Sequence, residues 1–417
     1  MNKVKKQIIY SLIFVLFFFL KSSAAKDGQT VRLVKSVDTR QLAWDWKWRV
    51  SDDNKIYPYI KITSDKIEFL DPEGTILNHF SYLPHYRLVT SDNQQFAAFV
   101  QRKGKIGNYE EYQERKFFAL RITDFSGREI FTIDIDLHYD DPIPGLILSN
   151  QGKVILLDGA AGEVKIFEND NDPINVVDLF DDDEFNYEKP IHCAINDSGD
   201  RFAVIAQKRP ASYDEETFEA ISGDPYLFYF DESGEEIWRI PIDSPTVSRV
   251  AISPSGKFIV VAHYSPGMKG DPILHTTIFN EAGKKIVDLP LLFRLSRFSG
   301  DEARLFVVDK KRMGIVEIDK KIYQIVNLIE KASNRMIIDL KNDAQKNPLI
   351  VTARSVFQNG RFEYAEPELV KMTQSGVAIW SLKFDEDIMI FPSIYLKGNQ
   401  IAIGFQHNFK LYKEERE

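Results

Sequence analysis

Three observations predict an all-β fold built from repeated four-stranded sheets. A segment of the form strand, tight turn, strand recurs along the 417-residue chain, and a second hairpin follows most of its copies. No stretch after residue 25 shows a helical spacing of apolar residues. Four to eight such sheets set around one axis form a β-propeller. A single β-propeller domain is therefore expected, although the length alone would suggest two or three domains.

The first hairpin of each repeat is clearest in two segments, "HCAINDSGDRFAVIAQ" at residues 192–207 and "RVAISPSGKFIVVAHY" at residues 249–264. The letters Ser-Pro-Ser-Gly are turn residues, because proline presets its φ angle and glycine accepts a positive one. The residues after the turn are β-branched and aromatic, which is typical of a buried strand.

The same pattern gives the number of blades. Further copies begin at residues 88, 146 and 296, and weaker copies begin at residues 48, 337 and 394. These eight copies recur at intervals of roughly 40 to 60 residues, which is the period of propeller blades. Eight blades are predicted. Seven is the alternative, if the copy around Lys47 leads into the ring without forming a blade.

A second hairpin completes each four-stranded blade, whose strands are lettered A to D from the axis outward. Its copies contain a strand, an acidic or amide residue, a small residue, a glycine and another strand, at residues 67–80, 118–133, 226–240, 276–289 and 369–382. The last blade supplies only three strands of its own. The segment "TVRLVKSV" at residues 30–37 is predicted to be its fourth strand, which would close the ring and cover an exposed edge.

These hairpins carry a resemblance to known propellers. The first hairpins resemble those of WD-repeat-like propellers of the bacterial exported type, as in the Tol system. The second hairpins, with "GEEIW" ending at Trp238 and "GVAIW" ending at Trp380, are similar to pyrroloquinoline-quinone-type repeats. The resemblance implies the fold over nearly the whole chain and leaves the function open, because propellers host many unrelated activities.

The N-terminus predicts export. Lys3, Lys5 and Lys6 precede an apolar stretch at residues 8–20, and the small residues Ser23 and Ala25 follow it. This is the pattern of a signal peptide at residues 1–25, with the propeller at residues 26–417. The expected location is the periplasm or the medium, with no membrane span once the signal is removed. An uncleaved anchor is the alternative.

Composition limits the class of partner and the chemistry. A net charge of −9 argues against a nucleic-acid partner, which would need a basic face. Cys193 is the only cysteine, so an internal disulfide is impossible. Its apolar neighbours predict a small core residue and argue against a nucleophile.

The B–C connections of blades 2, 4, 5 and 7 are long and rich in aromatic residues. In a propeller they lie with the D–A connections on one face, and strand A lines the channel. Exposed aromatics suit protein recognition. The predicted partner-binding residues are Tyr109, Tyr112, Tyr213, Phe218, Tyr264, Phe357, Phe362 and Tyr364. The alternative is that these rings pack the loops onto the rim.

A basic register marks the start of strand A. Alignment of the eight copies on their turns places the following residues at or beside one position: Lys47, Arg87, His192, Arg249, Arg294 and Arg335. A ring of positive charge at the channel mouth favours an anionic group, such as a carboxylate, a phosphate or an acidic peptide. The alternative is that each base pairs with an acidic residue of a D–A connection.

No catalytic motif, metal-ligand spacing or cofactor fingerprint is present, so no catalytic residue, metal or cofactor is assigned. The predicted function is an exported, non-catalytic binding or scaffold protein whose partner is a protein or a small anionic ligand. The alternative is a lyase or hydrolase acting on an anionic carbohydrate or peptide. The sequence leaves the identity of the ligand and the oligomeric state open.

Overall fold

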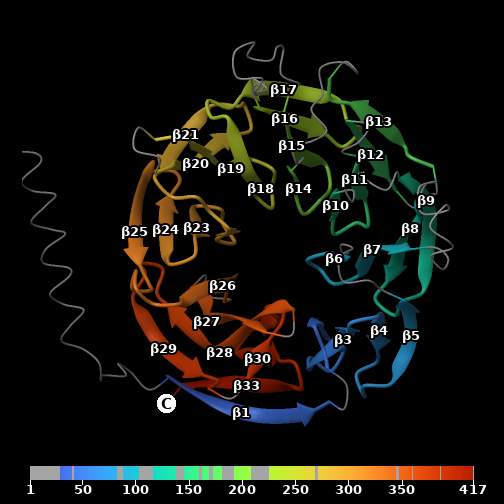
Figure 1. The fold of residues 1–417 in the computed structure, drawn as a ribbon, viewed down its shortest axis with the longest axis vertical. Helices are drawn as coiled ribbons and strands as arrows, with labels where there is room; N and C mark the ends of the chain where they lie inside the picture. Colours follow the sequence, from blue (N-terminus) through green and yellow to red (C-terminus); the bar gives the residue numbers. More distant parts are fainter. Residues whose placement is uncertain are drawn as a thin grey trace, which may run out of the picture.

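The sheets form a ring around a central axis in the computed structural model (Figure 1). The described residues are 29–39, 42–81, 88–102, 116–137, 145–158, 162–168, 172–180, 192–207, 225–267, 271–343, 347–358, 360–385 and 387–416. These ranges form strands and no helix, which confirms the predicted all-β class. No helix within them has the length and apolar character needed to span a membrane.

Each blade is an antiparallel sheet whose strands follow one another from the axis outward. Blade 1 contains β2 (Asp45–Val50), β3 (Ile56–Ile62), β4 (Lys66–Leu70) and β5 (Ile76–Ser81). Blade 2 contains β6 (Leu88–Thr90), β7 (Phe96–Arg102), β8 (Lys116–Asp124) and β9 (Glu129–Leu137). Blade 3 contains β10 (Gly145–Leu148), β11 (Val154–Asp158), β12 (Glu163–Phe167) and β13 (Asn175–Asp178). Blade 4 contains β14 (His192–Ile195), β15 (Arg201–Gln207), β16 (Pro225–Asp231) and β17 (Glu236–Pro241).

The second half of the ring repeats this order. Blade 5 contains β18 (Thr246–Ile252), β19 (Phe258–Ser265), β20 (Ile273–Asn280) and β21 (Lys285–Leu289). Blade 6 contains β22 (Leu295–Phe298), β23 (Arg304–Val308), β24 (Arg312–Glu317) and β25 (Ile322–Asn327). Blade 7 contains β26 (Arg335–Asn342), β27 (Pro348–Gln358), β28 (Arg361–Met372) and β29 (Ala378–Lys383), with β30 (Ile388–Met389) paired to β28. Blade 8 contains β31 (Ile394–Lys397), β32 (Gln400–Gly404), β33 (Asn408–Arg416) and β1 (Gln29–Asp38).

The predicted turn chemistry is present in the first hairpins. In blade 5, the N–H of Ser253 donates to the carbonyl of Phe258 at 2.8 Å, and the N–H of Gly256 donates back to the carbonyl of Ser253 at 2.9 Å. Gly256 has a φ of +82°, which a residue with a side chain adopts only under strain. The sequence pattern therefore fixes the register of strands A and B.

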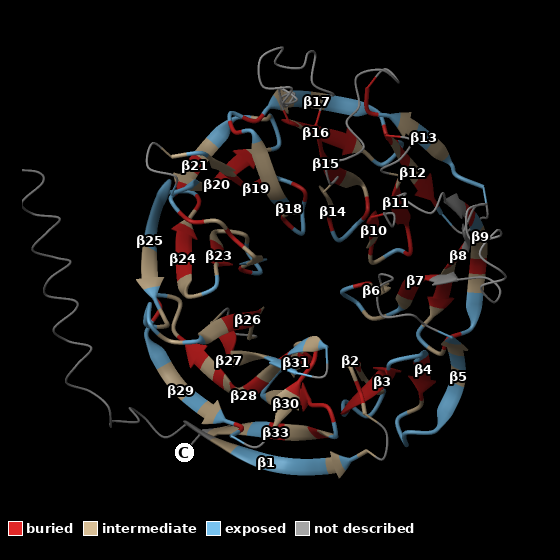
Figure 2. Ribbon diagram, viewed as in Figure 1, coloured by how far each residue is buried: buried red, intermediate tan, exposed pale blue. Residues whose placement is uncertain are grey.

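The apolar core lies between neighbouring blades. Figure 2 shows the second and third strands of most blades as buried and the outermost strands as exposed. Between blades 3 and 4, for example, Ile155 and Ile166 pack with Val204, Phe228 and other buried residues in one cluster. The alternation of side chains along each strand gives every inner sheet two apolar faces, so each blade needs a neighbour on both sides.

The ring is closed by the N-terminal strand, as predicted. Strand β1 pairs with β33 over nine residue pairs and becomes the outermost strand of blade 8. Trp46 and Trp48 of blade 1 also reach blade 8, because their indole N–H groups donate to the carbonyl of Phe405 and the hydroxyl of Ser393. The copy around Lys47 forms a complete blade, so the prediction of eight blades is confirmed and the alternative of seven is wrong.

The A–B turns form a hydrogen-bonded collar at one end of the channel. Neighbouring blades 2 to 6 are joined by contacts between Asn93 and Asn150, Asn150 and Asp197, Asp197 and Pro254, and Ser255 and Glu302. Each contact joins one turn to the turn of the next blade. The collar holds this end of the channel together, while the opposite end carries the B–C and D–A connections.

One predicted loop is wrong. Residues 354–368 of blade 7 were expected to form a long connection, but most of them continue β27 and β28 as a hairpin that ends at the pair Gln358↔Arg361. Gly360 in the turn has a φ of +77°. The letters Asn-Gly between two strand-like segments favour such a hairpin, so the signal was present in the sequence.

Candidate functional site

A pocket of about 480 Å³ lies in the channel wall formed by the inner strands of blades 3 to 6. It is lined by Ile147, His192, Cys193, Ser248, Arg249, Val250, Ala251, Phe293, Arg294, Leu295, Ser296 and Arg297. Three of the predicted ligand-binding residues, His192, Arg249 and Arg294, therefore share one pocket. Arg297 joins them, and none of the described residues in this lining is a carboxylate.

Arg297 was missed because the alignment considered only the start of each A strand. It lies two residues further along β22 from Leu295, on the same inner strand. A search for bases at alternate positions of strand A would have found it, since alternate residues share a face. Cys193, expected in the core, is half-buried and lines the pocket while packing against the core between blades 3 and 4.

Arg294 has the clearest binding geometry in the pocket. Its backbone N–H donates to the carbonyl of Val308 at 2.7 Å, which anchors it just before β22. Its side-chain Nη1 is buried and donates to no described residue, and no described carboxylate forms an ion pair with it. A buried guanidinium N–H without an acceptor is costly, so an anion in this pocket would supply the missing partner.

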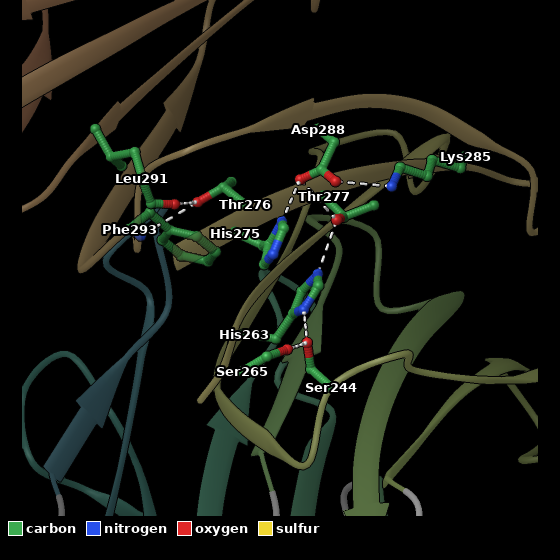
Figure 3. A network of polar contacts seen from close by, with 10 residues as sticks. All are labelled: Ser244, His263, Ser265, His275, Thr276, Thr277, Lys285, Asp288, Leu291 and Phe293. Carbon is green, nitrogen blue, oxygen red and sulfur yellow. Dashed lines mark hydrogen bonds and ion pairs between the residues drawn. The ribbon is translucent and has the colours of Figure 1, made fainter. Parts of the chain in front are cut away.

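The connection that carries Arg294 is held by Thr276. The fully buried hydroxyl of Thr276 donates to the carbonyl of Leu291 and accepts the N–H of Phe293 at 3.2 Å (Figure 3). Phe293 is 2% exposed and packs into the core between blades 5 and 6. The residue before Arg294 is thus fixed by both a hydrogen bond and burial.

A second part of the same network lies on the face of blade 5 that packs toward blade 4 (Figure 3). The ring of His263 is buried, with Nδ1 2.6 Å from the hydroxyl of Ser244 and Nε2 2.8 Å from the hydroxyl of Thr277. His275 stacks on it at 4.9 Å and contacts Asp288 at 3.2 Å. Burial, with a smaller effect of His275, lowers the pKa of His263 from 6.5 to about 4. The network joins Ser244, at the start of the blade, to strands B, C and D.

Two of the predicted bases are paired within their own blades. Nζ of Lys47 lies 2.7 Å from Asp45 on the same strand. Arg335 donates from Nη2 to the carbonyl and hydroxyl of Thr352 and lies 3.6 Å from Glu368. Glu368 belongs to strand C of blade 7, so this partner does not come from a D–A connection. Neither residue lines the pocket, and Arg87 lies outside the described residues.

The charges of different blades influence one another across the channel. Asp339 on its own would raise the pKa of Lys341, but burial and the positive charges of Arg297 and Lys47 outweigh it, so the pKa is lowered. These bases belong to blades 7, 6 and 1. Positive charges from three blades therefore act on one another near the axis, with Asp339 opposing them at Lys341.

The predicted partner-binding aromatics fall into three groups. Tyr109, Tyr112, Tyr213 and Phe218 lie outside the described residues. Tyr264 is the second-last residue of β19 and is half-buried, and Tyr364 packs against the core between blades 7 and 8. Phe357 and Phe362 face each other across the tip of the β27–β28 hairpin, each 65% exposed, with ring centroids 5.0 Å apart. Only this last pair offers an exposed aromatic surface among the described members.

Polar contacts hold the tip of that hairpin. The carboxylate of Glu363 is buried and accepts from Arg361 at 2.8 Å and from the amide of Gln358. The guanidinium of Arg361 lies over the ring of Trp44 at 5.1 Å. Among the described residues, no group of three or more His, Cys, Asp or Glu side chains is arranged to hold a metal ion.

Comparisons with known proteins agree on the fold. No family model matches the chain, and no curated protein matches it. The crystal structure of the C-terminal WD40 domain of Sif2 is similar over 92% of this chain and 98% of that one, at 10% identity and a TM-score of 0.55. The hydrazine synthase of Kuenenia stuttgartiensis matches 68% of this chain and 79% of that one, at 15% identity and a TM-score of 0.43. The fold is a β-propeller of eight blades, and the similarity to the WD40 domain of Sif2 is a similarity of fold.

Proposed function

We propose that this protein is an exported binding propeller that holds an anionic group in the channel pocket of blades 3 to 6. The observation that carries the proposal is the lining of that pocket, which combines His192, Arg249, Arg294 and Arg297 with no described carboxylate. Arginine is suited to carboxylate and phosphate because its planar guanidinium forms two parallel hydrogen bonds to them.

Binding fits the pocket better than catalysis. General acid–base chemistry needs an acid and a base of different pKa close together, and the described lining contains no acidic side chain. A ligand would therefore be held and oriented without being transformed. The exposed pair Phe357 and Phe362 adds a second surface, which we assign to a protein partner because rigid exposed aromatics are frequent contact residues.

Titration of anions into the protein tests the channel site. Citrate and inorganic phosphate are the probes, measured by calorimetry against sodium chloride of equal ionic strength. Replacing Arg294 by glutamine is expected to weaken binding at least tenfold, since one charge-assisted contact contributes about 1.5 to 3 kcal/mol. The matched control is Arg32→Gln, which removes an exposed arginine on β1 far from the pocket.

Two results would contradict the assignment. One is that neither probe binds the wild-type protein more tightly than chloride does. The other is that Arg294→Gln binds as the wild type does. A thermal melt of each variant checks that the fold is kept, because Arg294 has no ion pair with a described residue and its loss should leave the melting temperature nearly unchanged.

The export part of the proposal rests on the pattern of residues 1–25. Mass spectrometry of the protein purified from cells that express the whole chain is expected to find an N-terminus at Lys26. An intact N-terminus at residue 1 on the exported protein would favour the uncleaved anchor instead.

A further inference from the structure

A large groove lies between the first and last blades. It is a groove of about 1390 Å³, lined on one side by β1, β32 and β33 of blade 8 and on the other by β2, β3 and β4 of blade 1. Its mouth carries the A–B and C–D turns of blade 1, including Asp52 and Glu73. The groove therefore opens on the face opposite the B–C and D–A connections, and it is separate from the channel pocket.

The sequence explains why blade 1 leaves this space. Strands β3 and β4 form only three pairs, Ile60↔Phe69, Lys61↔Glu68 and Ile62↔Ile67, whereas β15 and β16 form seven. Continuing the register would place Asp71 opposite Pro58 and Pro72 opposite Tyr57. A proline has no N–H to donate to a ladder. The two strands therefore separate, and residues 56–59 lie outside the ladder with β4.

Two buried residues of opposite charge lie in the groove. Lys61 and Glu68 are 3.3 Å apart, with side chains 11% and 7% exposed, and both line the groove. Around them the walls are apolar, with Val50 and Leu70 on one side and Phe409 and Leu411 on the other. The groove can thus receive both apolar side chains and polar main-chain groups.

Arg49 supplies an unmatched positive charge in the groove. The Cζ atom of its guanidinium lies over the ring of Phe125, 3.3 Å from the ring centroid. Its Nη1 is buried and donates to no described residue, and no described carboxylate pairs with it. Stacking of this kind fixes the plane of the guanidinium and leaves its edge available for a carboxylate.

We propose that this groove binds an extended peptide segment that places a carboxylate on Arg49. Residues 56–58 line the groove outside the ladder with β4, so their main-chain groups can pair with such a segment, and the apolar walls take its alternate side chains. A compact anion would satisfy Arg49 but would leave both the strand edge and the apolar walls unused.

Peptide binding in this groove can be tested with a display library. Random 12-residue peptides are selected on the immobilised protein. Enriched peptides are expected to share one acidic position flanked by apolar residues. Synthetic peptides of that class, measured by fluorescence polarisation, should bind Arg49→Gln at least tenfold more weakly than the wild type. Arg294→Gln, in the channel pocket, should bind them unchanged, which separates this site from the proposed anion site.

A second measurement needs no variant. Amide hydrogen exchange of the wild-type protein should slow at residues 56–59 when the peptide binds and stay constant at residues 192–207. The proposal is overturned if no peptide class is enriched, if dodecanoate binds the groove while peptides do not, or if binding is the same in Arg49→Gln. Protection confined to the channel strands would also overturn it.

Discussion

Replacing Lys371 by methionine is expected to lower the free energy of unfolding by about 3 to 5 kcal/mol. The ammonium of Lys371, on β28 of blade 7, lies 2.8 Å from Asp343 and 2.9 Å from Glu414, and its side chain is only 3% exposed. Glu414 belongs to β33 and faces Val31 of the closing strand β1. The substitution would leave two buried carboxylates without their cation beside the seam of the ring.

Urea unfolding followed by circular dichroism measures this effect. The matched control is Lys383→Met, which removes an exposed lysine from the neighbouring strand β29 and should change stability by less than about 0.5 kcal/mol. Equal stability of the two variants would show that the buried ion cluster does not hold blades 7 and 8 together.

Mild acid is expected to destabilise the fold through His263. The pKa of His263 is about 4 in the folded protein and 6.5 when exposed. Between pH 6.5 and pH 4 the unfolded chain therefore binds a proton at His263 that the folded protein does not bind. The contribution of this group to stability is constant above pH 6.5, falls as the pH drops from 6.5 to 4, and is constant again below 4. The total loss is about 3 kcal/mol, of which about 2.5 kcal/mol is reached at pH 4.5.

The comparison of wild type with His263→Gln isolates this group from the carboxylates that titrate nearby. At pH 7.5 the variant should be the less stable protein, since the hydrogen bonds to Ser244 and Thr277 are disturbed. The gap in unfolding free energy should shrink by about 2.5 kcal/mol at pH 4.5. His79→Gln, at an exposed position on β5, should follow the wild-type curve. A gap that is independent of pH would contradict the account.

The repeats of the sequence predict the ring well because the information is local. A turn such as Ser253 to Gly256 and the alternating strands beside it decide each hairpin. Seven pairs of hairpins and three further strands then leave one sheet a strand short, which identifies β1 as the closing strand. The hairpin of blade 7 was missed because its length suggested a loop, although Asn-Gly marks the turn.

The candidate site was only partly predictable, because pairing between distant residues decides which bases are available. The alignment placed Arg335 and Arg294 in one class. Arg335 is held by Thr352 and Glu368, both distant in the sequence, whereas Arg294 lines the pocket and its Nη1 donates to no described residue. The groove at Arg49 depends on Pro58 and Pro72, which lie on different strands and come near each other only in the folded hairpin, so no single stretch of sequence predicts it.

A crystal structure of the protein soaked in sodium tungstate would test the central claim most directly. Tungstate is a phosphate-like anion whose anomalous scattering locates it without ambiguity. The account predicts a peak in the channel pocket within hydrogen-bonding distance of Arg294, with Arg249 beside it. Peaks only at exposed lysines, with none in the pocket lined by His192, Arg249, Arg294 and Arg297, would contradict the assignment of this channel as an anion site.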